Sequence, residues 1–161
     1  MEIICGSNPS FHNMGAKELG TDEIDGFLKD QGDGVLSLTD GGETYAVPEA
    51  FGYDGEDVYF QFVFTEDSQK RDFIETTEIA TLTVYSTESG RSVAVRGYLE
   101  CLSDNGEMGA VAALTDNANI PAVNTDLSYD SDDLIVEFYR LRIEELSGRD
   151  FEGLRGTVSG P

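Results

Sequence analysis

The sequence predicts a mainly β protein, an antiparallel, Greek-key-like barrel decorated by a few short helices. Five or six segments have the residue pattern of β-strands, and most follow one another through short turns rich in Gly and Asp. Helical segments do not alternate with every strand, so the crossover rhythm of a parallel sheet is missing. With 161 residues, 39% of them hydrophobic, the chain is long enough for one domain with a substantial core.

The first helix is predicted directly after an N-terminal arm. Residues 1–20 are rich in Gly and Asn without a sustained hydrophobic period, and we interpret them as this arm. Thr21 is expected to be the N-cap, because two acids follow it in the first turn. The helix is expected to end near Gly32. Its three apolar residues fall on one helical face and are Ile24, Phe27 and Leu28.

Three strands follow, separated by two turn signals. Residues 34–39 form an apolar run closed by Asp-Gly-Gly, and residues 44–53 form a long strand that contains Pro48. Because proline cannot donate to a ladder, we expect Pro48 at a bulge or at an unpaired edge. After an Asp-Gly turn, residues 57–64 (DVYFQFVF) are predicted as the third strand, in which alternate side chains belong to the core.

The second half of the chain contains the remaining elements. A short helix is predicted over residues 68–76 and an Ala-rich helix over residues 107–115, and a polar loop is expected from residue 116 to residue 133. The barrel domain then comprises residues 21–148, and residues 149–161 are a C-terminal tail. The strands predicted in this half are residues 79–86, 91–102 and 134–146.

Charge is the strongest global feature of the chain. Ten Lys and Arg against 32 Asp and Glu give a formal net charge of −22. Such a surface repels phosphate backbones and anionic lipids, so we expect neither nucleic acid nor a membrane as a partner. Self-repulsion on this scale destabilises the compact state in low salt, so we expect a halophilic protein from a salt-rich cytoplasm. The alternative is an unusually acidic protein from a mesophile.

No conventional catalytic or metal site is visible in the sequence. His12 is the only histidine, so no Ser-His or Cys-His pair can be built outside the arm. Cys5 and Cys101 lack paired spacing, and Cys101 is expected to be a small buried hydrophobic residue at the end of its strand. Residues 130–133 (DSDD) lack the EF-hand pattern, so no metal is predicted. Without a long apolar run or a secretory signal, a cytoplasmic location is expected.

Scarce cations carry more information in this chain than abundant acids. Lys70 and Arg71 stand at the start of the second predicted helix, directly behind Ser68. A helix N-terminus with a hydroxyl group and cations is a ready phosphate site. The alternative is that both cations neutralise nearby acids such as Glu66, Asp67 and Asp72.

The order of segments between residues 34 and 100 is characteristic. A GVLSL strand, a YAVPEAF strand, DGEDVYFQF, a Ser-Gln-Lys step into a helix and RSVAVRG follow one another, with FYRLRIEELSGR as a looser continuation. This block resembles the pyridoxamine-phosphate-oxidase-like family of FMN-binding split barrels. The resemblance implies a split β-barrel that forms a homodimer, with FMN in two clefts between the subunits. Together with the acidity, it indicates a haloarchaeal-type member.

The resemblance also implies which residues hold the cofactor. The second strand lines the flavin ring with its backbone, and the third strand lies under the ring. The Ser-x-Lys step reaches the phosphate, and the partner subunit contributes the start of the RSVAVRG strand. The cofactor-binding residues implied in this way are Tyr45, Ala46, Val47, Pro48, Glu49, Ala50, Phe60, Gln61, Ser68, Lys70, Arg91 and Ser92.

Two positions depart from well-known members of the family. Tyr45 stands where the oxidase itself has an Arg that grips phosphate, which argues against oxidation of pyridoxine phosphates. Gln61 stands where nitroimidazole-reductase-like relatives carry a His, which argues against their chemistry. The Trp and Arg that complete the oxidase substrate pocket are not evident, and Arg149 is a distant candidate for the second of them.

Three functions are open at this point. The first is a dimeric FMN-dependent oxidoreductase that acts on an unidentified small molecule. The second is a carrier or sensor that binds a flavin or a deazaflavin coenzyme without turnover. The third is an interaction domain that has kept the barrel and lost the ligand. No catalytic residue can be named, and Glu49, the only acid in the ring-lining strand, is expected to be a surface or interface acid.

Overall fold

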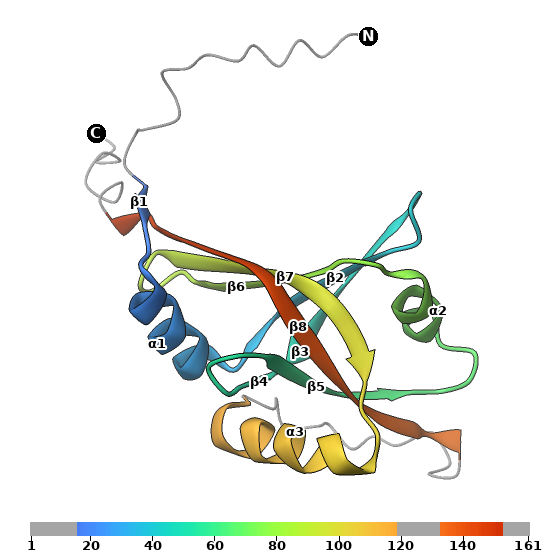
Figure 1. The fold of residues 1–161 in the computed structure, drawn as a ribbon. Helices are drawn as coiled ribbons and strands as arrows, with labels where there is room; N and C mark the ends of the chain where they lie inside the picture. Colours follow the sequence, from blue (N-terminus) through green and yellow to red (C-terminus); the bar gives the residue numbers. More distant parts are fainter. Residues whose placement is uncertain (1–15, 119–132, 153–161) are drawn as a thin grey trace, which may run out of the picture.

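The computed structural model describes residues 16–118 and 133–152 (Figure 1). In these residues the chain forms one curled antiparallel sheet, a half-barrel surrounded by three short helices, which confirms the predicted class. The strand order is β3-β2-β6-β7-β8-β5-β4, with β1 beside β8. In chain order the elements are β1 (Lys17–Glu18), α1 (Thr21–Gln31), β2 (Asp33–Thr39), β3 (Thr44–Ala50), β4 (Gly52–Tyr53), β5 (Val58–Phe64), α2 (Gln69–Thr76), β6 (Ala80–Ser86), β7 (Arg91–Cys101), α3 (Asp104–Asn117) and β8 (Ile135–Asp150).

Helix α1 forms where the sequence predicts it, with a different N-cap. Gly20, one residue before the predicted Thr21, occupies the cap position, and its N–H donates to Glu23 Oε2 at 2.9 Å. The helix ends at Gly32, whose φ of 71° is the left-handed conformation that glycine adopts without strain. The three apolar residues predicted on one face, Ile24, Phe27 and Leu28, are all buried.

Strand β3 lies at one end of the sheet. The turn before it is fixed by Asp40, whose Oδ1 accepts the N–H groups of Gly42 at 2.9 Å and Glu43 at 2.7 Å. Pro48 stands opposite Val35 of β2 in a ladder without a register shift, so of the two predicted places it occupies the edge and not a bulge. The register shift of the described ladders lies between β7 and β8, where Arg96 and Gly97 stand opposite Glu145 and Ile143.

The long strand predicted over residues 44–53 is split into β3 and β4, because α3 packs closely on its end. A Cβ at Gly52 would lie 2.4 Å from the carbonyl carbon of Ala113 in α3, so only glycine allows this approach. Asn117, the last residue of α3, accepts the N–H of Tyr53 at 2.6 Å and donates to the carbonyls of Leu28 and Lys29 in α1. Helix α3 therefore joins β4 to α1 along the lower side of the sheet in Figure 1.

Strand β8 is the longest element and continues four residues beyond its predicted end at residue 146. It pairs with β7 from Tyr139 to Asp150, with β5 from Ile135 to Leu141, and with β1 at its end. Gly148 allows this end to be covered, because a Cβ there would lie 3.0 Å from the side chains of Leu19 and Ile24. Arg149 and Asp150, predicted as the start of the tail, are therefore paired in the sheet.

The core lies inside the curl of the sheet. Strand β5 supplies its aromatic part, since Phe60, Phe62 and Phe64 are buried while Gln61 and Val63 between them are exposed, as the predicted alternation requires. No polar or charged residue is buried in the described part of the chain, so its acids are all at least partly hydrated.

Other sequence predictions have mixed outcomes. Cys101 is exposed, so the prediction of a buried thiol is wrong; it is the last residue of β7 and lies beyond the buried part of the strand, which ends at Gly97. Cys5 and His12, most of the predicted polar loop and the last residues of the tail lie outside the described ranges. None of the helices among the described residues is long and apolar enough to cross a lipid bilayer.

Candidate functional site

The outer edge of β3 carries backbone groups that no strand of the described sheet pairs. The N–H of Phe51 donates to Gly32 at 2.9 Å, which fixes the side of the chain that faces β2. Because N–H and C=O groups alternate between the two sides of a strand, the backbones of Ala46, Pro48 and Ala50 point to the free edge. Pro48 offers only its carbonyl there. This edge can accept and donate hydrogen bonds to a flat heterocycle.

The side chains of β3 alternate between two environments. Tyr45, Val47 and Glu49 are half-buried on one face, whereas Ala46 and Pro48 are exposed on the other. The Tyr45 ring stacks on Phe73 of α2, with ring centroids 5.3 Å apart and planes 16° from parallel. Val47 packs against the core. One face of β3 is therefore attached to α2 and the core, and the other faces solvent.

Glu49 and Lys70 form a contact between β3 and α2. The Lys70 ammonium is ion-paired with Glu49 Oε1 and lies 4.5 Å above the centroid of the Phe62 ring. Each of the two charged side chains is only 12% exposed. We call Tyr45, Glu49, Phe62, Lys70 and Phe73 the β3–α2 cluster. It holds one cation at the edge of the barrel, close to the unpaired side of β3.

Helix α2 is held in place at both ends. At its C-terminal end the Thr77 hydroxyl accepts the N–H of Thr39 at 3.0 Å and so ties the helix to β2. At its start, Ser68 is the N-cap, and its carbonyl accepts the N–H of Arg71 at 3.0 Å. The Arg71 guanidinium lies 5.7 Å from the Phe64 ring centroid and pairs with Glu75 at 3.7 Å. Lys70 and Ser68 are thus fixed together at one helix N-terminus.

The electrostatics of Glu49 are dominated by its burial. Desolvation raises the pKa of the Glu49 carboxyl above its ordinary value, and the hydrogen bond and charge of Lys70 oppose this rise. Both cations pair with acids, as one predicted alternative has it, but with other acids than those expected: Lys70 pairs with Glu49 on another element, and Arg71 pairs with Glu75 one turn along α2. The phosphate site at this helix N-terminus stays a prediction. A cation in a poorly hydrated position beside free backbone groups can bind an anionic, planar ligand.

The succession of elements from α1 to β8 matches a known family. A family model described as pyridoxamine 5'-phosphate oxidase matches residues 20–150. The chain belongs to the pyridoxamine 5'-phosphate oxidase family. The match begins at the N-cap of α1 and ends at the last residue of β8, so it contains the whole half-barrel except β1.

Solved structures share the fold of this family member at low sequence identity. A FAD-binding protein from Mesorhizobium loti has a TM-score of 0.64 and 21% identity over 84% of this chain and 96% of its own. The FAD and heme binding protein from Mycobacterium smegmatis has a TM-score of 0.61 and 20% identity, over 86% and 74% of the two chains. The FAD binding protein from the same organism has a TM-score of 0.57 and 18% identity, over 85% of this chain and 100% of its own. The comparison with curated proteins gives no match.

The family resemblance assigns two residues of β5, Phe60 and Gln61, to the cofactor site, but one lies in the core and the other on the surface. The Phe60 side chain is fully buried and stacks on Phe62 at 5.3 Å, so it offers a ligand no surface of its own. Gln61 is exposed and lies opposite Phe138 of β8. Since neighbouring side chains of a strand point to opposite faces, Gln61 does not join Lys70 and Phe62 in the same subunit.

Arg91 and Ser92, at the start of β7, also lie apart from the β3–α2 cluster. Two strands, β2 and β6, stand between β3 and β7 in the sheet. The Arg91 guanidinium is ion-paired with Asp150 at 3.1 Å, and Ser92 lies opposite Tyr85 and Arg149. The family resemblance assigns these two residues to the partner's cleft, and the geometry of one chain leaves that assignment a prediction.

Two adjoining cavities connect Pro48 with Arg91 on the solvent side of the sheet. One, of about 420 Å³, is lined by Val35, Pro48 and Tyr85, among others. The next, of about 450 Å³, is lined by Phe27 and Arg91, among others, and both cavities share Ser86 and Glu88. The exposed face of β3 therefore opens towards the β6–β7 turn, a feature that strand patterns alone do not show.

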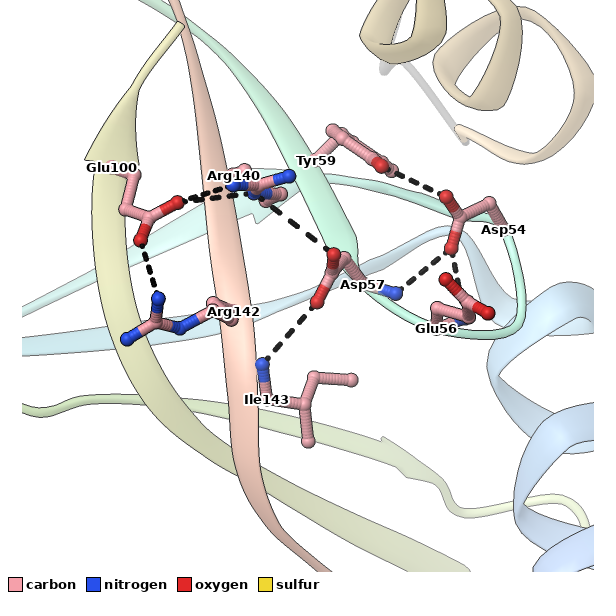
Figure 2. A network of polar contacts seen from close by, with 8 residues as sticks. All are labelled: Asp54, Glu56, Asp57, Tyr59, Glu100, Arg140, Arg142 and Ile143. Carbon is pink, nitrogen blue, oxygen red and sulfur yellow. Dashed lines mark hydrogen bonds and ion pairs between the residues drawn. The ribbon is translucent and has the colours of Figure 1, made fainter. Parts of the chain in front are cut away.

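A second polar region lies on the central strands (Figure 2). Glu100 of β7 accepts hydrogen bonds from Arg140 at 2.5 Å and lies 3.1 Å from Arg142 Nη1, both on β8. The guanidinium of Arg140 lowers the pKa of the Glu100 carboxyl. Asp57 lies 3.9 Å from Arg140 Nε and accepts the N–H of Ile143. We call Asp57, Glu100, Arg140 and Arg142 the Arg140 network; it joins β7 and β8 to the residue that precedes β5.

Sequence reasoning missed the contacts that position Lys70. Phe62 and Phe73 were expected only as core residues, yet one lies under the ammonium of Lys70 and the other stacks on Tyr45. The spacing of apolar residues in α2 places Phe73 on the inner face of the helix. No local pattern predicts which strand that face packs against. The pairing of Glu49 with Lys70 joins residues 21 positions apart and has no local signal.

Proposed function

We propose that this protein is a flavoprotein that binds FMN and, as a homodimer, acts as an FMN-dependent oxidoreductase on a small molecule. The observation that carries the proposal is the position of Lys70. A cation 12% exposed, fixed on a helix N-terminus, stands beside a strand whose outer backbone groups are unpaired in the described sheet. A flavin phosphate needs the first of these features, and the pyrimidine edge of the ring needs the second.

The residues present fit this cofactor. Lys70 and the Ser68 hydroxyl would hold the phosphate, because both stand at the N-terminus of α2, where the helix dipole favours an anion. The edge of β3 at Ala46, Pro48 and Ala50 would bind the ring through its backbone. Bound FMN supplies hydride acceptance and delivery, and the protein residues orient it.

Neighbouring structures support a flavin as the ligand class. The similar proteins from M. loti and M. smegmatis are described as binding FAD, whose ring and first phosphate are the same as those of FMN. We propose FMN because one fixed lysine and one serine suit a single phosphate group. A deazaflavin coenzyme, with a similar tricyclic ring, is the alternative cofactor.

Homodimerisation is supported by apolar side chains left on the surface of the sheet. Val63 of β5 and Val136 of β8 are direct cross-strand partners, and both are about half exposed. A second copy would cover such a pair and would bring its own Arg91 and Ser92 to the cofactor cleft. The site of one chain would then be completed by the other.

A flavin carrier or sensor is the second candidate function. Glu49 is engaged with Lys70, so the one acid of β3 is not free to move a proton to or from a substrate. The described side chains near the β3 edge thus bind and orient without an evident acid or base. An enzyme of this kind would leave proton transfer to water or to its substrate.

The acidity of the chain supports a halophilic, haloarchaeal-type protein. A net charge of −22 on 161 residues causes strong self-repulsion, which concentrated salt screens. We therefore propose that it functions in a salt-rich cell interior.

The absorption spectrum of the purified protein tests the proposal. We expect a flavin spectrum, release of FMN on heating, and bleaching by a nicotinamide donor followed by reoxidation with an acceptor. Bleaching without reoxidation by any acceptor tested would favour the carrier or sensor. A colourless monomer that takes up neither FMN nor a deazaflavin would contradict both functions.

A further inference from the structure

The Glu49–Lys70 pair differs from the other ion pairs of the described residues in its burial. Both side chains are 12% exposed, whereas every other pair has at least one side chain that is about a third exposed or more. The pair also crosses from the edge strand β3 to α2. A cation that serves only to neutralise surface acids has no need of this position.

Glu49 is already bound to Lys70, the cation that a phosphate group would require. A phosphate dianion placed on Lys70 would meet the carboxylate of Glu49 on the same ammonium group. The next cation, Arg71, is paired with Glu75 and packed over Phe64, so it does not balance the second anion. Two anions on one poorly hydrated cation repel each other strongly.

We propose that Glu49 competes with the phosphate group of the ligand for Lys70 and so sets how tightly this site binds a phosphorylated flavin. This inference rests on the flavin function proposed above and concerns its phosphate subsite alone. In the free protein Glu49 is the counter-ion of Lys70. In the complex the phosphate takes its place.

Displacement of Glu49 from Lys70 should change the protonation of the Glu49 carboxyl. The carboxyl of Glu49 is ion-paired with Lys70 of α2, whose ammonium lies over the uncharged Phe62 ring of β5. On β2, Gly34 stands opposite Glu49 in the ladder, and Asp33 is the residue before Gly34. Burial raises the pKa of Glu49, and Lys70 alone opposes the rise. Once phosphate engages Lys70, that opposition is lost, so Glu49 takes up a proton as the ligand binds.

The test compares FMN with riboflavin, which has the same ring and no phosphate. Flavin-free wild-type protein and Glu49→Gln are titrated with each ligand by fluorescence quenching in the same salt. Glu145→Gln is the matched control, since it removes the same charge from an ion pair that is more than half exposed. We expect Glu49→Gln to bind FMN about tenfold more tightly at about pH 8, the scale of one charge-assisted hydrogen bond. Riboflavin affinity and the control should not change.

The pH dependence separates Glu49 from the ligand's own titration. The phosphate loses its second proton near pH 6, but it does so equally for both proteins. The FMN affinities of wild type and Glu49→Gln should therefore converge as the pH falls from about 8 through the raised pKa of Glu49, because Glu49 becomes neutral in the wild type. The wild type can also be tested without any variant, by calorimetry in two buffers of different ionisation enthalpy. This should record proton uptake with FMN at a pH just above the raised pKa of Glu49.

The outcomes distinguish this inference from the proposed function. Equal FMN affinity of wild type and Glu49→Gln at the higher pH, or an equal gain for riboflavin, overturns the competition and leaves the flavin function standing. Absence of proton uptake in the wild type overturns it as well. Failure of both proteins to bind FMN and riboflavin overturns the competition and the proposed function together.

Discussion

The β3–α2 cluster and the Arg140 network use charge in opposite ways. The first joins one acid and one lysine, nearly hidden from water, at the edge of the sheet. The second joins Glu100 and Asp57 to two arginines that remain partly exposed on central strands. In the network each acid has more than one partner, so the loss of one contact leaves others. The Glu49–Lys70 pair at the edge of the sheet is a single contact, so its loss leaves neither charge with another partner in that pair.

This difference separates a charge kept for a ligand from charges that join strands. Exposed ion pairs contribute little to stability, and a network that joins two adjacent strands and the turn before a third serves mainly register. A pair whose side chains are only 12% exposed carries a desolvation cost that a structural role does not require. We infer that Lys70 is held ready for an anion that is not part of the chain.

The largest expected effect comes from removing the cation of the cluster. Lys70→Ala should weaken FMN binding by about 2 kcal/mol, roughly thirtyfold in affinity, because one charged phosphate contact is lost. Fluorescence titration with FMN measures it. Lys29→Ala, which removes an exposed lysine from α1, is the control and should bind as the wild type does. Unchanged affinity in Lys70→Ala would remove Lys70 from the site.

Salt should act on the whole surface more than on the nearly buried Glu49–Lys70 pair. Screening of a net charge of −22 relieves self-repulsion, so the thermal midpoint should rise with salt. We expect a rise of about 5 °C or more between ~0.1 M and ~2 M KCl, since 1 kcal/mol moves the midpoint of a domain of this size by roughly 3 °C. Calorimetry at fixed pH measures it. A midpoint that does not respond to salt would argue against the halophilic proposal.

The two acids, Glu49 and Glu100, should give opposite dependences of stability on pH. The pKa of Glu49 is raised above its ordinary 4.5, so its stabilising contribution is complete below pH 4.5 and is lost as the pH rises through the folded value. The pKa of Glu100 is lowered, so its contribution is present above 4.5 and is lost as the pH falls through the folded value.

Substitution of each acid shows these signs directly in urea unfolding. Relative to wild type, Glu49→Gln should gain stability as the pH rises above 4.5, whereas Glu100→Gln should be less stable at neutral pH and approach wild type in acid. Differences of the same sign for both variants would show that the two regions do not differ as described.

The smallest effect is expected in the Arg140 network. Arg140→Met should lower the free energy of unfolding by at most about 1 kcal/mol, since its side chain is 36% exposed and solvent screens its ion pairs. FMN affinity should stay at the wild-type value. Urea unfolding and FMN titration of the same preparation measure both quantities. A large loss of FMN affinity would place this network in the cofactor site.

Local signals were sufficient for most of the fold. The period of Ile24, Phe27 and Leu28 predicted the buried face of α1, and the alternation in β5 predicted its core residues. The Asp-Gly-Gly signal predicted the β2–β3 hairpin. Each of these features is set by residues a few positions apart, so each could be predicted from the sequence.

Contacts between distant segments account for what was missed. The break between β3 and β4 exists because α3, some 60 residues later, approaches Gly52. The extension of β8 depends on cover from Leu19 and α1. The cations of α2 were recognised as a candidate phosphate site, but their counter-ion Glu49 lies on an edge strand whose partner could not be predicted.

A crystal structure of the protein grown with FMN tests the central claim most directly. The account predicts the phosphate within hydrogen-bond distance of Lys70 Nζ, the ring along the backbone of residues 46–50, and the Glu49 carboxyl turned off the lysine. A phosphate bound elsewhere, with the contact between Glu49 and Lys70 intact, would contradict it.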